Sequence, residues 1–294
     1  MKNIALIGTL ALLAGCALVA CATMASLSAS PVQLPATAVG GAPCDPPLVI
    51  PASIVASVRA QLDAPGSPRP AVPPEDMAAY QKMQAEQGKK DWAALCYFRA
   101  DNAALAAQPA PADRVVFMGD SITQLWGIAE PQDFGPARVN RGISGQTTPQ
   151  MLLRFKQDVL ALKPKAVHIL AGINDIAGNT GPTTLEDIEN NIASMIELAK
   201  AQGVQVILAT PLPAARFTWA PQLQPGPQVA QYADWVRRYA AEQDLVLADY
   251  YPVLATSDGA LKPELGPDGV HPNKDGYALM KPVLNAAIVE ALGR

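Results

Sequence analysis

Residues 114–123 have the sequence Arg-Val-Val-Phe-Met-Gly-Asp-Ser-Ile-Thr, an apolar run that ends at a glycine and is followed by a serine. The length and β-branched content of residues 115–118 predict a buried strand, and Gly119 lets the backbone turn sharply. Ser121 is then expected where the strand ends and a helix begins, a place where free N–H groups favour negative charge. Asp120 and Ser121 would serve equally well as ordinary helix caps, so this stretch alone leaves both interpretations open.

Short apolar runs alternate with amphipathic helical patterns from residue 113 onward. The runs cover residues 115–118, 138–140, 167–171, 204–209 and 245–248. Strands that alternate with helices in this way pair in parallel, and the helices cover both faces of the sheet. The pattern therefore predicts an α/β fold with a parallel five-stranded sheet. Neither a glycine-rich dinucleotide motif nor a phosphate-binding loop follows the first run, so nucleotide binding is not supported.

Composition excludes several classes of function. The chain has 294 residues, half of them hydrophobic, and a formal net charge of −4, so it offers no basic face to a nucleic acid. Its two histidines and four scattered cysteines show no spacing typical of a metal site. We therefore expect neither a nucleic-acid partner nor a structural zinc ion.

The amino terminus has the order of an export signal. Lys2 precedes an apolar run over residues 4–20, which is short for a membrane span. Small residues precede Cys16 and Cys21, so residues 1–21 resemble a bacterial lipoprotein signal with an ambiguous cut site. Ordinary cleavage after Ala25 or Ala29 is the alternative. We expect an exported protein of the periplasm or outer membrane, attached to the membrane only through this signal or its lipid.

The next segments are expected to be a flexible linker over residues 22–50 and a helical extension over residues 51–110. Helical patterns cover residues 51–62, 74–87 and 91–106, and they are too short to form a large core alone. We expect them to pack on a main domain of residues 111–294. In an oxidising compartment Cys44 and Cys96 could form a disulfide, although two buried thiols are the alternative.

A nucleophilic serine needs a base, and the chain offers two imidazoles. His168 lies within a buried-strand pattern, where a hydrogen-bonded core histidine is the better interpretation. His271 lies in a loop rich in proline and glycine, just before the last helical pattern. Asp268 stands three residues earlier and could orient the imidazole, or it could simply form an Asx-turn.

Two further loops offer donors for a developing oxyanion. Gly145 follows the second apolar run and could present a backbone N–H. Asn174 follows the third run, and its amide is a donor that does not titrate. Each loop alone is more often structural than catalytic, but the four elements together favour a catalytic site at one edge of the sheet.

These residues resemble the four sequence blocks of the SGNH, or GDSL-type, hydrolases, in the same order along the chain. The blocks are Gly119-Asp-Ser-Ile-Thr123, the glycine of Ile143-Ser-Gly145, the asparagine of Gly172-Ile-Asn-Asp175, and Asp268-Gly-Val-His271. The resemblance implies a flavodoxin-like three-layer α/β/α sandwich. It also implies Ser121 as nucleophile, His271 as base and Asp268 as its orienter. The oxyanion hole would be formed by the N–H groups of Ser121 and Gly145 and by the side chain of Asn174.

The blocks look most similar to the acetylhydrolase-like branch, which includes carbohydrate acetylesterases. We therefore expect a serine esterase for short acyl groups such as acetyl groups on a glycan or a small molecule, with no cofactor or metal. Trp126, Arg216 and Trp219 are candidates for the substrate pocket, although packing is the alternative for both tryptophans. The rival functions are a lysophospholipase or thioesterase for longer acyl chains, and a binding module of the cell envelope without catalytic activity.

Overall fold

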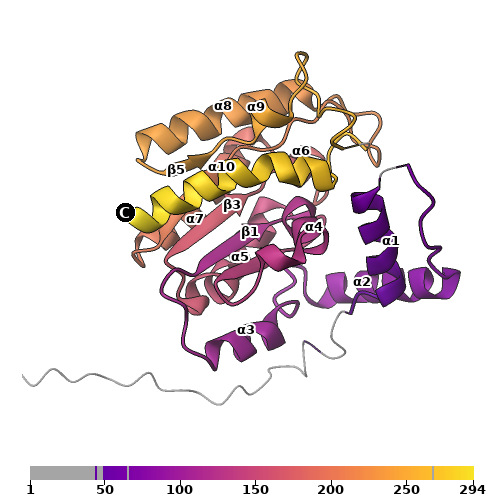
Figure 1. Ribbon diagram of the computed structural model, residues 1–294, viewed down its shortest axis with the longest axis horizontal. Helices are drawn as coiled ribbons and strands as arrows, with labels where there is room; N and C mark the ends of the chain where they lie inside the picture. The colour runs from indigo at the N-terminus through magenta and orange to yellow at the C-terminus, as the bar shows by residue number, and fades with distance from the viewer. Residues whose placement is uncertain (1–43, 45–48, 65, 267) are drawn as a thin grey trace, which may run out of the picture. The chain divides into compact units, whose positions relative to one another are not determined.

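The computed structural model describes residues 44, 49–64, 66–266 and 268–294 (Figure 1). The expected signal over residues 1–21 lies outside the described residues, as does the expected linker apart from Cys44, Val49 and Ile50. None of the helices in the described ranges combines the length and the apolar character that a membrane span requires.

Five parallel strands form one sheet in the order β2-β1-β3-β4-β5. They are β1 (Val115–Gly119), β2 (Arg138–Gly142), β3 (Ala166–Leu170), β4 (Gln205–Ala209) and β5 (Val246–Ala248). The chain passes from β1 to the edge strand β2 and then returns to the other side of β1 to form β3. Ligands of such sheets bind at the carboxyl ends of the strands beside this reversal.

Alternate side chains of β1 face opposite layers of helices, because successive residues of a strand point to opposite faces. Val115 and Phe117 belong to one buried apolar cluster, together with residues of α4 (Ser121–Ala129) and α10 (Lys274–Gly293). Val116 and Met118 belong to the other, together with residues of α5 (Thr148–Asp158), α7 (Leu185–Lys200) and α8 (Gly226–Glu242). This arrangement confirms the predicted three-layer α/β/α fold.

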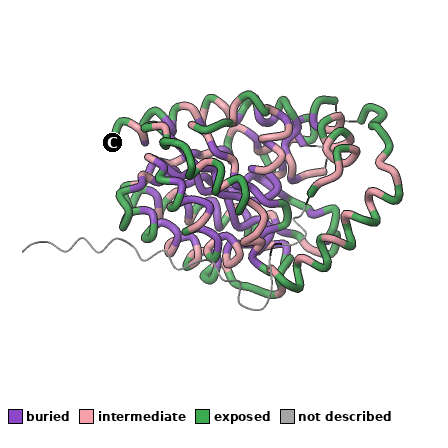
Figure 2. The backbone as a smooth tube through the Cα atoms, turned by 90° about the horizontal axis from the view of Figure 1, so that it is seen from below, coloured by how far each residue is buried: buried purple, intermediate pink, exposed green. Residues whose placement is uncertain are grey.

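Figure 2 shows the buried residues gathered in the centre of the described fold, with exposed residues on the outer sides of the helices. Short helices complete the connections between the larger elements. They are the 3₁₀ helices η1 (Pro131–Asp133) and η2 (Leu160–Leu162) and the single-turn helices α6 (Ile173–Ile176) and α9 (Tyr251–Leu254). The one-turn helix α6 follows β3 directly and carries Asn174.

Three helices precede the sheet: α1 (Ala52–Asp63), α2 (Pro74–Lys90) and α3 (Arg99–Ala106). Leu62 of α1 belongs to the same buried cluster as α4 and α10. The connection between α2 and α3 is tied to the loop before α5 and to α5 itself, since Gln146 Nε2 donates to Ala93 O at 3.0 Å and Gln157 Nε2 donates to Leu95 O at 2.6 Å.

The predicted helix over residues 91–106 is wrong in its first half. Asp91 ends α2, and its carboxylate accepts the backbone N–H groups of Leu95 and Cys96 at 2.8 and 2.7 Å. Ala94 has a φ of 55°, which breaks helical geometry, so helix begins again only at Arg99. Cys96 in this irregular turn forms a disulfide with Cys44, which confirms the pairing that the sequence left open.

Candidate active site

Ser121 lies at the first position of α4, directly beyond the carboxyl end of β1. A side chain at Gly119 would come within 2.1 Å of Thr123 Oγ1 and 2.9 Å of Leu170 O, so only glycine fits this turn. Asp120 caps α4, because its carboxylate accepts the N–H of Ile122 at 2.9 Å. Burial raises the pKa of Asp120 to about 6, although the Ile122 N–H and the charge of His271 act in the opposite direction.

Ser121 and His271 are in contact although 150 positions separate them in the chain. The Ser121 Oγ lies 2.8 Å from His271 Nε2, and His271 Nδ1 lies 2.7 Å from Asp268 Oδ2. The structure thus brings together the three residues in the order of a nucleophile, a base and an orienting carboxylate. Ser121 is 8% exposed, so neighbouring residues cover most of its surface.

The loop before α10 holds Asp268 in place with both of its carboxylate oxygens. Oδ1 accepts the backbone N–H groups of Val270 and His271 at 2.9 and 2.8 Å, while Oδ2 faces the imidazole. Burial by itself would raise the pKa of Asp268, but the hydrogen bond and charge of His271 and the two N–H groups outweigh it and lower the pKa. Asp268 is therefore both the Asx-turn and the imidazole partner that the sequence offered as alternatives.

His168 is a core histidine, as the sequence favoured. It lies in the middle of β3, 1% exposed, and its Nε2 is 3.0 Å from the Tyr250 hydroxyl. Burial lowers the pKa of His168 to about 3, so the imidazole is neutral at physiological pH. Of the two histidines, only His271 contacts the serine.

The two loops expected to supply oxyanion donors lie against each other. Asn174 Nδ2 donates to the Gln146 carbonyl at 3.0 Å, next to Gly145, whose φ is 79°. Asn179 joins the two loops, because its Nδ2 donates to Asn174 Oδ1 at 3.0 Å and to Gly145 O at 3.2 Å. No motif in the sequence pointed to Asn179, which lies only five residues beyond Asn174.

Arg154 is a second residue that the sequence gave no reason to select. It is fully buried in α5, where its Nη2 donates to Gly119 O at 3.1 Å and its Nε donates to Gln146 Oε1 at 2.5 Å. An ion pair of 3.2 Å with Asp158 compensates its charge. Burial lowers the pKa of Arg154 to about 10, which still leaves it cationic. The guanidinium thus ties the turn before Ser121 to the loop that carries Gly145.

Residues 117–279 match the model of the GDSL-like lipase/acylhydrolase family. The chain belongs to this family. An acetylxylan esterase of Geobacillus stearothermophilus is 26% identical over 201 residues, which cover 57% of this chain and 90% of that protein. The crystal structure of a GDSL-like lipase from Bacteroides thetaiotaomicron is 40% identical, covers 68% of this chain and 100% of its own, and superposes with a TM-score of 0.65. An uncharacterized lipoprotein, YqeF, of Bacillus subtilis is 38% identical over 78 residues, which cover 26% of this chain and 32% of that protein.

Membership confirms the predicted class of enzyme, a serine carboxylic ester hydrolase of the GDSL type. It also confirms the resemblance to the SGNH hydrolases and to their acetylesterase-like relatives. The matched residues begin within β1 and end within α10, so they span the sheet edge with Ser121 and His271 and leave out α1, α2 and α3.

The residues predicted for the substrate pocket of this GDSL-type hydrolase lie in different places. The prediction that Trp126 lines the pocket is wrong, because its side chain is 1% exposed in the core and stacks on Tyr277 with ring centroids 5.1 Å apart. Trp219 is 43% exposed, and its ring lies 6.0 Å from the His271 ring. Arg216 is exposed and lies against Gly269, in the turn between Asp268 and His271.

Within the ranges that the structure describes, no group of three or more histidine, cysteine, aspartate or glutamate side chains is arranged to hold a metal ion. The chemistry that the described site offers is that of a hydroxyl, an imidazole, a carboxylate and nearby amides.

Proposed function

We propose that this hydrolase is an exported esterase that removes short acyl groups, above all acetyl, from carbohydrate, with Ser121, His271 and Asp268 as its catalytic residues. The observation that carries the proposal is the hydrogen-bonded series from the Ser121 hydroxyl through His271 to Asp268, at 2.8 and 2.7 Å. The acetylxylan esterase relative supports the acetyl group and the carbohydrate.

In the proposed reaction Ser121 Oγ attacks the ester carbonyl while His271 Nε2 takes the hydroxyl proton. The tetrahedral intermediate then collapses, the bond from the carbonyl carbon to the alkoxy oxygen breaks, and Nε2 gives its proton to the leaving alcohol. Water attacks the acyl-enzyme with the same imidazole as base, which releases the acid and restores Ser121. Asp268 keeps the Nδ1 proton on the far side of the ring and stabilises the imidazolium.

We assign the oxyanion hole to the N–H groups of Ser121 and Gly145 and to the Asn174 amide. A side-chain amide has two hydrogens, and Asn174 uses one of them on the Gln146 carbonyl. The second is then a donor for the oxyanion, while the bond from Asn179 holds the amide oxygen back. Donors fixed in this way need no reorganisation as the charge develops.

A short acyl group is supported by the size of the cavity beside Gly145, one of the proposed oxyanion donors. It measures about 190 Å³. Pockets that bury drug-sized ligands measure about 300–1,000 Å³. A lysophospholipase or thioesterase would require room for a longer chain.

Export is proposed from the amino-terminal sequence, with residues 1–21 as the signal and residues 22–50 as the linker. The Cys44–Cys96 disulfide supports an oxidising compartment. The YqeF lipoprotein relative supports lipid attachment. We further propose residues 51–110 as a helical extension of a hydrolase domain formed by residues 111–294.

A fluorophosphonate probe, followed by mass spectrometry of the labelled peptide, tests the assignment of the nucleophile. We expect label on Ser121 in the wild type and neither label nor cleavage of p-nitrophenyl acetate in Ser121→Ala. A folded wild type that takes no label would favour a binding module instead. A p-nitrophenyl ester series tests the acyl length, since a preference for long chains would favour the lysophospholipase or thioesterase.

A further inference from the structure

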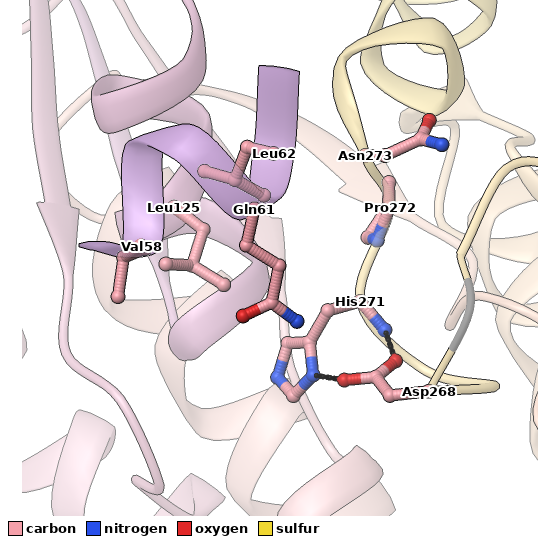
Figure 3. A pocket seen from close by; sticks show the side chains of 8 residues that line it. All are labelled: Val58, Gln61, Leu62, Leu125, Asp268, His271, Pro272 and Asn273. Carbon is pink, nitrogen blue, oxygen red and sulfur yellow. Dashed lines mark hydrogen bonds and ion pairs between the residues drawn. The ribbon is translucent and has the colours of Figure 1, made fainter. Parts of the chain in front are cut away.

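A cavity beside the catalytic triad takes part of its wall from α1, which lies outside the residues that match the family (Figure 3). Val58, Gln61 and Leu62 of α1 line it on one side, and Leu125, His271 and Asp268 are among the residues that complete it. The helix is anchored, because Leu62 is buried in the main apolar cluster and Asp63 lies 3.5 Å from Lys274 Nζ. The wall is therefore a fixed part of the site.

The cavity adjoins the hydroxyl and the imidazole rather than the candidate oxyanion donors. Ser121 and Leu125 are four residues apart in α4, so they share one face of that helix. His271 lines the cavity and holds Ser121 Oγ at 2.8 Å. Neither Gly145 nor Asn174 is among the described residues that line it.

The direction of proton transfer decides which half of an ester this cavity receives. The proton that His271 Nε2 takes from Ser121 Oγ goes to the alkoxy oxygen as the acyl carbon–oxygen bond breaks. The alcohol must therefore lie on the imidazole side, while the carbonyl oxygen faces its donors elsewhere. We propose that this cavity is the alcohol subsite, with α1 as its wall and Gln61 as a specificity-determining residue. This inference rests on the proposed esterase function.

The lining indicates the chemical class of the alcohol. Val58, Leu62 and Leu125 offer an apolar surface for the carbon face of a ring. Gln61 Oε1 accepts a hydrogen bond from Arg69 Nη1 at 2.5 Å, so the oxygen is engaged outside the His271 side, where Figure 3 shows the amide nitrogen. Figure 3 shows the Gln61 side chain extending from α1 toward the His271 ring. At about 160 Å³ the cavity accepts a single small ring.

A second, more polar hollow continues from the first and shares Gln61 and Asp268 with it. Its other lining residues include Ser67, Arg69 and Thr218, whose hydroxyl and guanidinium groups suit the hydroxyls of further sugar units. An apolar face beside one amide donor, followed by a polar groove, fits a monosaccharide ring that belongs to a glycan. It does not fit a long aliphatic alcohol.

Substrates that vary only in the alcohol test this assignment on the full-length protein. We would measure kcat/KM for methyl acetate, cyclohexyl acetate and a methyl pyranoside monoacetate. Val58→Phe fills the cavity and is expected to lower the ratio of pyranoside to methyl ester by about tenfold or more. Gln61→Ala removes the donor and should lower the ratio of pyranoside to cyclohexyl ester by about tenfold. The matched control is Ala56→Phe, which introduces the same phenylalanine side chain on the exposed side of α1 and should keep both ratios within about twofold.

Circular dichroism establishes whether Val58→Phe is folded. If Val58→Phe is unfolded, the ratio of pyranoside to cyclohexyl ester in Gln61→Ala, which adds no bulk, tests the assignment of the cavity. The inference is overturned if both ratios stay at the wild-type value in folded variants. It is also overturned if Val58→Phe changes the preference between methyl acetate and methyl butyrate instead, because the cavity would then hold the acyl group. A wild type that cleaves none of these esters and takes no fluorophosphonate label contradicts the proposed function itself.

Discussion

The substitution Asp268→Asn tests the orienting role of the carboxylate with almost no change of shape. In the wild type, Oδ1 accepts two backbone N–H groups and Oδ2 accepts the Nδ1 proton of His271. Asparagine has one oxygen, so it cannot serve both sets of donors. If its oxygen stays on the backbone N–H groups, its NH₂ faces Nδ1 and favours the tautomer with the proton on Nε2, which cannot accept the Ser121 proton.

The size of the effect follows from what the tautomer with the proton on Nδ1 loses in the variant. It loses a hydrogen bond to a charged group, which contributes about 1.5–3 kcal/mol. Its Nδ1–H also faces the asparagine NH₂, and leaving these two donors without acceptors costs about 1–3 kcal/mol more. The sum of roughly 3–6 kcal/mol corresponds to a loss of about 10²–10⁴-fold in kcat. We expect this loss for p-nitrophenyl acetate, together with a comparably slower fluorophosphonate labelling of Ser121.

A matched control comes from the loop between α9 and α10, where Asp258 is exposed and accepts a hydrogen bond from Thr256. Asp258→Asn should keep kcat within about twofold of the wild type. If folded Asp268→Asn also retains kcat within about fivefold, then Asp268 does not orient the base and only forms the turn.

Three further outcomes are expected. Asn174→Ala removes a proposed oxyanion donor and should lower kcat by about 10²–10³-fold, measured at saturating p-nitrophenyl acetate. Replacing Cys44 and Cys96 with alanine opens a loop with a sequence separation of 52, and chain entropy predicts a loss of about 4 kcal/mol in the urea-derived free energy of unfolding. The pKa of His168 is depressed to about 3, so its contribution to stability is complete above pH ~6.5 and is lost as the pH falls toward 3. His168→Gln should therefore weaken the acid dependence of that free energy by up to about 1.4 kcal/mol per pH unit relative to the wild type.

The central strands were predictable because a strand that is buried on both faces has an unbroken run of apolar residues in the sequence. All five residues of β1 and of β3 are buried, and both strands appear as unbroken apolar runs except for His168. The proximity of the first and third strand-end loops was predictable for a different reason. Strand ends of a parallel sheet meet at one edge, so the loops that hold Ser121 and Asn174 come together once the strand order is given.

The prediction for Trp126 was wrong because a helical sequence does not reveal which neighbours its apolar side will meet. Trp126 follows Ser121 by five residues, near enough to suggest a pocket, yet it turns inward and stacks on Tyr277 of α10. The loss of helix over residues 91–98 has a local cause, since Asp91 directs its carboxylate to two backbone N–H groups that a helix would use. The helix propensity of residues 91–98 favoured a helix, but the Asp91 side chain competes for the backbone N–H groups and prevents it.

The position of α1 depends on contacts that sequence spacing does not specify. Val58 and Leu62 are four residues apart and predict an apolar stripe on α1, but the stripe by itself does not say which surface it covers. In the structure it lines one cavity together with Leu125 and His271, which lie about 65 and 210 positions further along the chain. The four motif blocks hold the residues that we propose as reactive, whereas α1 lies outside them and lines the space beside the imidazole. Two chains with the same four blocks can therefore share one reaction and still differ in the alcohols they accept, because this wall can change without moving Ser121, His271 or Asp268.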